Sequence, residues 1–113
     1  MGMNVALKSL EFSRTVPPSY FRSLGDQINR AAFSIPANIA EGCGRGTLKD
    51  KSRFIDMATG SCYELETHLL ISLKANIGNK ILATRILELI NEEGKMLTGY
   101  SQKLKEFIKN QSQ

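Results

Sequence analysis

The stretch from Gln27 to Gly46, QINRAAFSIPANIAEGCGRG, combines a helical pattern with residues that oppose a helix. Apolar residues recur at spacings of three and four around Ile28 and Ile35, which is the pattern of one face of an amphipathic helix. Pro36 stands inside this pattern, although a proline ring removes one backbone donor and clashes with the preceding turn. Glycines then end the pattern, because glycine reaches left-handed dihedral angles at little cost. The stretch therefore predicts a helix that bends or restarts near Pro36 and stops at a glycine-rich turn.

Two helices are predicted in the N-terminal part of the chain. Residues 3–14 have the apolar spacing of a short helix. Pro17 and Pro18 then interrupt the chain, because proline disfavours helical geometry in the residue before it. Ser19 is the expected N-cap of the second helix, which runs over about 20–41.

Two longer helices are predicted in the rest of the chain. Thr47 begins the third helix, and Asp50 three residues later completes a pattern that resembles a capping box. This helix is expected to end near Ile77, and the fourth is expected from about Lys80 to Lys109. The sequence has no strand-like alternation of useful length, no internal repeat and no low-complexity linker. The predicted fold class is therefore all-α.

Short connections make successive helices antiparallel neighbours. This predicts an up-down-up-down four-helix bundle as a single domain over residues 1–113, with a short first helix and a Pro-bent second helix. At 1.5 Å per residue, the third and fourth helices would each span roughly 45 Å, and the first only about 18 Å. The first helix then leaves part of the apolar stripes of its neighbours uncovered. Another copy of the chain is the simplest cover, so we expect a homo-oligomer.

The composition is ordinary for a globular protein, with 42% hydrophobic and 23% charged residues. No apolar run approaches the roughly 20 residues of a membrane helix, and no signal-peptide pattern occurs, so no membrane association is expected. Cys43 and Cys62 lack the CxxC spacing. We interpret them as reduced thiols of a cytoplasmic protein, in preference to a disulfide between them.

The net charge of +4 is unevenly distributed. Residues 45–53 and 95–109 each carry four cations against one carboxylate, whereas carboxylates dominate residues 81–94. In the predicted bundle, the start of the third helix and the end of the fourth lie at the same end, which concentrates the positive charge there. A basic surface of this kind is a candidate for contact with RNA or DNA, although a solvated helix face is the alternative. The candidate phosphate contacts are Arg45, Lys49, Lys51, Arg53, Lys103, Lys105 and Lys109.

Two ordered motifs resemble those of a known family. Residues 34–45 read SIPANIAEGCGR and resemble the SIPxNIAEGxGR signature of the four-helix-bundle family that is also called the 23S ribosomal RNA intervening-sequence proteins. Residues 60–67, GSCYELET, are similar to the GSxxELET segment of that family, and residues 27–32 fit its pattern as well. The resemblance covers about residues 16–108. It departs from the family at the N-terminus, where members usually have a longer first helix, and at Cys43, where an aromatic residue is common.

The resemblance implies a bacterial four-helix bundle that assembles into a ring, commonly a homopentamer. Some members are encoded within insertions of large-subunit ribosomal RNA. Others are similar to basic accessory proteins of diversity-generating retroelements, which associate with nucleic acid and a reverse transcriptase. No enzymatic activity is established for the family.

Polar residues on or beside the apolar stripes need partners if they are buried, because an unpaired internal charge is costly. We predict that Arg30 and Asn38 on the second helix pair with Glu64 or Glu66 on the third and so set the helix register. Glu41 belongs to the same predicted network. In the alternative interpretation, these side chains extend to water.

The sequence favours neither a metal site nor catalysis. His68 is the only histidine, and Leu65 stands where a Glu-x-x-His motif would need glutamate. Glu64 and His68 are four residues apart and could bind a metal only weakly. The GCGRG turn lacks the Gly-Lys-Ser/Thr ending of a phosphate-binding loop and follows no predicted strand. No recognisable triad is present, so we expect no enzyme, no cofactor and no metal.

Two functions remain compatible with the sequence. The favoured one is an oligomeric scaffold that associates with nucleic acid through its basic end. The alternative is a protein-interaction scaffold that recruits another protein, such as a reverse transcriptase, without direct contact to nucleic acid.

Overall fold

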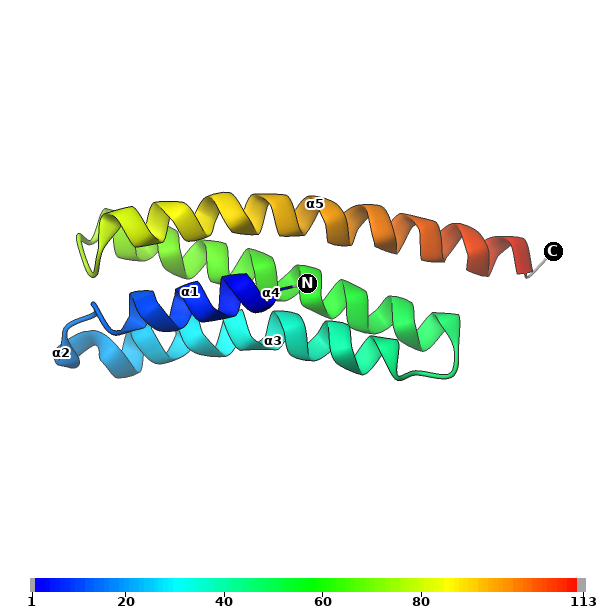
Figure 1. Cartoon of the computed structure of the whole chain (residues 1–113), viewed down its shortest axis with the longest axis horizontal. Helices are drawn as coiled ribbons and strands as arrows, with labels where there is room; N and C mark the ends of the chain where they lie inside the picture. Colours follow the sequence, from blue (N-terminus) through cyan, green and yellow to red (C-terminus); the bar gives the residue numbers. More distant parts are fainter. Residues whose placement is uncertain (1, 112–113) are drawn as a thin grey trace.

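The computed structural model describes residues 2–111 and consists of helices joined by short connections (Figure 1). Successive long helices run antiparallel and pack into one bundle, which confirms the predicted all-α four-helix architecture. The elements are α1 (Met3–Ser13), α2 (Pro18–Tyr20), a π-helical segment (Phe21–Gly25), α3 (Asp26–Cys43), α4 (Leu48–Lys74) and α5 (Lys80–Gln111).

The first helix is short, as predicted, and covers only one half of the bundle (Figure 1). The described chain measures 54 × 20 × 18 Å along its principal axes, and α1 has only 11 residues. α1 packs against α3 and α5, and α4 packs against the same two helices from the other side. Among residues 2–111, no fourth helix covers the half of the bundle that holds the end of α3, the start of α4 and the end of α5.

The second predicted helix is bent and extends from Pro18 to Cys43. Pro18 stands at its first turn, where the missing N–H of proline costs nothing, and Pro17 is the N-cap. The prediction of Ser19 as the N-cap is therefore wrong. The helix widens into the π-helical segment after Tyr20, and Pro36 lies inside α3, which continues beyond it.

The N-terminal end of α1 lies directly against Pro36. Gly2 is buried, and a Cβ at this position would lie 3.0 Å from Ile35 Cγ2 and 3.2 Å from the nitrogen of Pro36. Its φ of 85° is also a value that side-chain-bearing residues rarely adopt. The proline thus provides the flat surface on which the chain starts its first helix.

The turn between α3 and α4 forms much as the sequence predicts. The side-chain oxygen of Thr47 accepts a 3.2 Å hydrogen bond from the backbone N–H of Asp50, which confirms the predicted N-cap of α4. Gly44 ends α3 with a φ of −87°, so the expected left-handed glycine does not occur there. The N–H of Gly44 instead reaches the carbonyl groups of Ala40 and Glu41.

The turn between α4 and α5 uses left-handed residues. α4 ends at Lys74, three residues before the predicted Ile77, because Asn76 and Gly78 adopt φ values of 57° and 81°. Gly78 lies over the ring of Phe12, which is fully buried at the end of α1. This contact holds the turn on the first helix.

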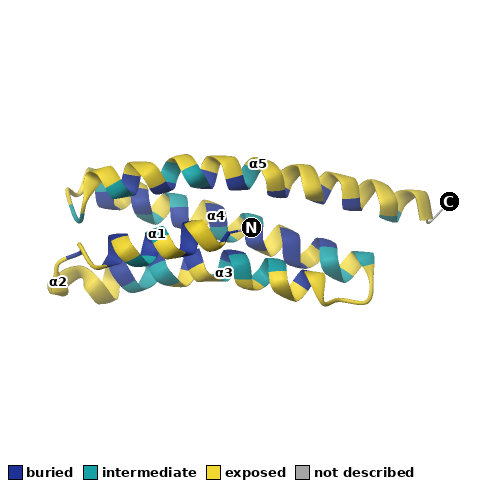
Figure 2. Cartoon of the chain, in the orientation of Figure 1, coloured by how far each residue is buried: buried dark blue, intermediate teal, exposed yellow. Residues whose placement is uncertain are grey.

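Each helix directs one face into a shared core, as the alternating burial in Figure 2 shows. The apolar stripes predicted for α3 and α4 are buried or half-buried. On α5, Tyr100 and Phe107 continue the helical spacing of the apolar stripe but are exposed. Ser101 is buried instead, between Leu97 and Leu104 on the same face, and hydrophobicity alone does not reveal a buried serine.

Candidate nucleic-acid interface

The start of α4 and the end of α5 lie side by side at one end of the bundle (Figure 1). Lys49 and Arg53 of α4 and Ile108 of α5 line the same open depression. The two basic segments therefore converge in space, as the antiparallel order of the helices requires. We call this region the basic end and define it by Arg45, Lys49, Lys51, Arg53, Lys103, Lys105 and Lys109.

The last turn of α3 closes onto the first turns of α4. A Cβ at Gly42 would lie 3.1 Å from Phe54 Cβ and 3.4 Å from the carbonyl oxygen of Lys51. This close approach needs a residue without a side chain, and it brings the turn that carries Arg45 next to Phe54.

Two arginines stack on the ring of Phe54. The guanidinium carbons of Arg45 and Arg53 each lie 4.6 Å from its centroid, which is cation–π distance. Arg45 also pairs with Glu41 at 3.1 Å, and Arg53 lies 3.9 Å from Asp50. Both guanidinium groups thus have a ring and a carboxylate as partners within the chain.

Asp56 connects α4 to the end of α5. Its Oδ1 accepts a 2.8 Å hydrogen bond from Ser101, and its Oδ2 lies 3.4 Å from Lys105 Nζ. Lys105 is therefore partly neutralised, as are Arg45 and Arg53.

Four of the seven predicted cations have no ion pair among residues 2–111. They are Lys49, Lys51, Lys103 and Lys109. Lys49, Lys103 and Lys109 are exposed, and Lys51 is half-buried. The basic end therefore presents unpaired ammonium groups around a frame of paired arginines.

The predicted polar network does not form within the chain. Arg30 is exposed and pairs with Asp26 on its own helix, at 3.6 Å. Asn38 donates a 2.8 Å hydrogen bond to the backbone oxygen of Ser34, also on its own helix. The prediction of pairing with α4 is wrong for the single chain, because Arg30 lies opposite the buried stripe of Ile28 and Ile35 and its side chain extends to solvent.

The carboxylates of that predicted network are also placed locally. Glu41 pairs with Arg45, and Glu64 lies 3.5 Å from His68 Nε2. Glu66 is half-buried and makes no ion pair within the part of the chain that the structure describes. None of them contacts Arg30.

Glu93 is one of the polar residues that the sequence places beside an apolar stripe, but it was assigned no partner there. Glu93 of α5 is 6% exposed, and its Oε1 has no hydrogen-bond partner in the structure. Burial raises the pKa of this carboxyl group above its ordinary value. Burial also raises the pKa of the Cys62 thiol to about 11, and the charges of Glu93 and Glu66 add to that effect. The sequence signal for its burial is the spacing: Glu93 precedes Leu97 by four residues and therefore falls on the buried face of α5.

The described residues form no group of three or more histidine, cysteine, aspartate or glutamate side chains that could hold a metal. Cys43 and Cys62 are free thiols. Within residues 2–111, no helix combines the length and the apolar character that crossing a membrane requires.

The fold and the site together define an all-α bundle with a basic end. Residues 1–99 match the model of the 23S rRNA-intervening sequence protein family. Because the match covers most of the chain, the protein belongs to this family. None of the curated proteins compared with the chain matches it.

Proposed function

We propose that the chain is a non-catalytic, oligomeric scaffold of the cytoplasm that associates with nucleic acid through its basic end. The observation that carries this proposal is the convergence of two basic segments, with four lysines that lack ion pairs among the described residues. Lysines of this kind bind phosphates by charge, and such binding is favourable because it releases counterions from the nucleic acid.

RNA is the first ligand to test, because the family description names 23S rRNA. We expect contacts mainly to phosphates. Phe54 is buried beneath two guanidinium groups and offers no free face for a base, whereas Phe107, between Lys105 and Lys109, is exposed and could stack on a base of any kind. Binding should therefore be salt-sensitive and weakly dependent on sequence.

An oligomer would strengthen this binding. The pentamer that the family resemblance implies would present several basic ends to one ligand, and linked weak contacts bind more tightly than separate ones. Several weak phosphate contacts together could then give an affinity that no single basic end provides.

Binding of a structured RNA and of single-stranded DNA, measured by fluorescence anisotropy at about 50 and 200 mM salt, tests the proposal. The variant Lys49→Gln/Lys103→Gln/Lys109→Gln should lose affinity about tenfold or more at the lower salt and show a shallower salt dependence. The control Lys8→Gln/Lys74→Gln/Lys80→Gln removes the same charge from the opposite half of the bundle and should bind nearly as wild type. Equal losses of affinity in both variants would mean that the total positive charge of the protein determines binding and that the basic end has no special role.

The alternative function is a scaffold that recruits another protein. Exposed apolar side chains favour it, among them Met3, Leu7 and Phe33. Absence of binding by the wild type at about 50 mM salt, where phosphate contacts are strongest, would support this alternative.

A further inference from the structure

An apolar face formed by α1 and α3 has no cover within the chain. Met3 and Leu7 are each 64% exposed, and Phe33 is 45% exposed. An open depression on this face has an almost entirely apolar lining. We call it the α1–α3 face; it is lined by Met3, Ala6, Leu7, Leu10, Phe33, Pro36 and Ala37.

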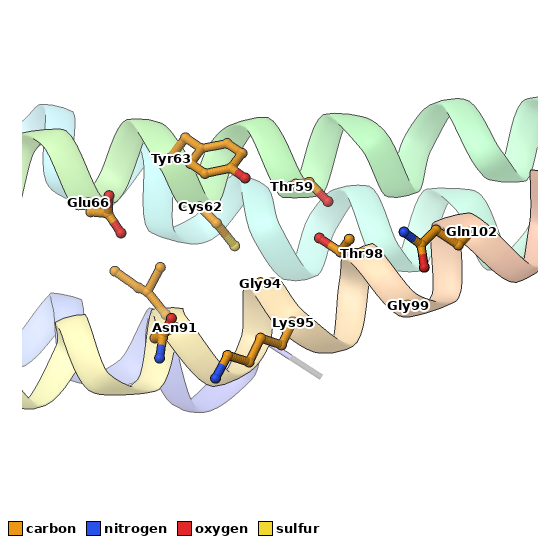
Figure 3. Close-up of a pocket in the computed structure, with 11 residues that line it drawn as sticks. Thr59, Cys62, Tyr63, Glu66, Asn91, Gly94, Lys95, Thr98, Gly99 and Gln102 are labelled. Carbon is orange, nitrogen blue, oxygen red and sulfur yellow. The ribbon is translucent and has the colours of Figure 1, made fainter.

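A groove of about 380 Å³ runs between α4 and α5 (Figure 3). Cys62, Tyr63 and Glu66 form part of its α4 wall, and Gly94 and Gly99 lie in its α5 wall. We call it the α4–α5 groove.

The two glycines keep this groove open. No described atom lies within 4 Å of the position that a Cβ would take at Gly94 or at Gly99. Glycine is the least favourable residue after proline in a helix interior. Nothing in the described part of the chain requires the small size of these two glycines, so they leave room in the groove for a close approach by another molecule.

The α1–α3 face and the α4–α5 groove lie on opposite sides of the bundle. α1 and α3 pack against each other, as do α4 and α5, and α3 and α5 join the two pairs. Both surfaces also lie at the same height along the bundle. The Oγ atoms of Ser34 and Ser61 are 2.6 Å apart, and these residues adjoin Phe33 on one surface and Cys62 of the groove on the other.

Charges of both signs lie beside each surface: Arg30 and its partner Asp26 beside the α1–α3 face, and Glu66 and Lys95 in the wall of the α4–α5 groove. Arg30 lies one turn before Phe33 on α3, and its side chain is 72% exposed. Glu66 lies one turn after Tyr63 on α4, half-buried in the groove and without an ion pair among residues 2–111. Because α3 and α4 are antiparallel, a step from Phe33 to Arg30 and a step from Tyr63 to Glu66 run in the same direction. Arg30 and Glu66 therefore lie at similar heights along the bundle axis.

We propose that the α1–α3 face of one copy of this chain docks into the α4–α5 groove of a second copy, with Arg30 pairing with Glu66 across the contact. The proposal rests on the oligomer of the proposed function and names its interface. Since the two surfaces differ, the contact is head-to-tail. Since they lie at one height, repetition does not climb along the helix axis, and a rotation between successive copies about an axis parallel to the helices would close a ring. The arginine–glutamate pairing predicted within one chain then forms between copies.

Light scattering coupled to size-exclusion chromatography of the full chain tests this interface. The wild type should have a mass that is a multiple of 12.5 kDa. Arg30→Glu and Glu66→Arg should each raise the concentration of half-dissociation about tenfold or more, because each places like charges together. The double variant Arg30→Glu/Glu66→Arg should restore assembly. The control Glu64→Arg reverses a nearby exposed carboxylate that does not line the groove, and should assemble as wild type.

The variants Gly94→Leu and Gly99→Leu provide a second test of the interface. Each fills the groove where the chain itself leaves open space, so helical content by circular dichroism should persist while the assembly dissociates. Two results would overturn the assigned surfaces without excluding an oligomer. One is a multimeric wild type whose assembly is unchanged by the glycine variants. The other is a loss of assembly in the single charge reversals that the double variant fails to rescue. A wild type of 12.5 kDa would overturn the oligomer itself. Nucleic-acid binding is measured separately and is not decided by either result.

Discussion

Ser101 donates a 2.8 Å hydrogen bond to Asp56 and so joins the end of α5 to the start of α4. The serine is buried and the aspartate is exposed, so the bond lies at the edge of the core. The same carboxylate also lies within 3.4 Å of Lys105. Asp56 thus orders the basic end and weakens its charge at the same time.

Asp56→Asn separates these two effects. The amide oxygen can still accept the hydrogen bond from Ser101, but the negative charge beside Lys105 is lost. We expect affinity for RNA at about 50 mM salt to rise several-fold, with a steeper salt dependence and little change in melting temperature. Glu88→Gln is the control, because Glu88 forms a comparable exposed pair, with Arg85, away from the basic end. Unchanged affinity in Asp56→Asn would argue against phosphate contact at this end.

Gly78→Ala should destabilise the fold by about 2–4 kcal/mol, the sum of a left-handed conformation and a displaced core ring. Gly78 has a φ of 81°, and a Cβ there would lie 2.6 Å from Phe12 Cζ. Urea unfolding followed by circular dichroism measures the difference. Gly60→Ala is the matched control: it lies inside α4 with open space around it, and it should raise stability by roughly 1 kcal/mol. Equal stability of the two variants would contradict the close contact at Phe12.

Glu93→Gln should raise the melting temperature at pH 7. Burial raises the pKa of Glu93, so the folded state binds its proton more tightly than the unfolded state does. The wild type therefore loses stability as pH rises from about 4.5 through the raised pKa, and the loss persists at neutral pH. Glutamine carries no charge, so its advantage should shrink as pH falls through the raised pKa and be smallest below about 4.5. Thermal melts of both proteins between pH 4 and pH 8 test this, and an advantage that does not depend on pH would contradict it.

Arg45→Met measures the stacking on Phe54. Arg45 and Arg85 each pair with a glutamate at 3.1 Å, but only Arg45 lies over an aromatic ring. Arg45→Met should therefore cost about 0.5–1 kcal/mol more than the control Arg85→Met. Chemical denaturation of the two variants gives the comparison. Equal costs would mean that the ring contributes nothing beyond the ion pair.

Local signals in the sequence predicted the helices well. Thr47 and Asp50 form the expected cap, because that interaction depends only on residues three apart. A left-handed glycine was expected in the glycine-rich turn over residues 42–46, but none of these glycines has a positive φ, whereas Gly78 has. Glycine permits this geometry without requiring it, and the contact of Gly78 with Phe12 lies far away in sequence.

The site was predicted in outline and not in detail. The convergence of the basic segments follows from antiparallel helices alone. The pairing of Arg30 was predicted wrongly because it depends on which face of α3 points toward α4, and that face is set by the buried stripe through Ile28 and Ile35. The stacking of Arg45 and Arg53 on one ring depends on side-chain directions that spacing does not specify.

The shortness of α1 divides the bundle into two unequal halves. Backbone amides in the half that α1 covers are shielded by four helices, whereas those near the end of α5 are shielded by fewer neighbours. We expect deuterium uptake to proceed first in the last turns of α5 and last around Phe12. If the basic end contacts nucleic acid as proposed, it can adjust its shape to an irregular polyanion while the opposite half stays folded.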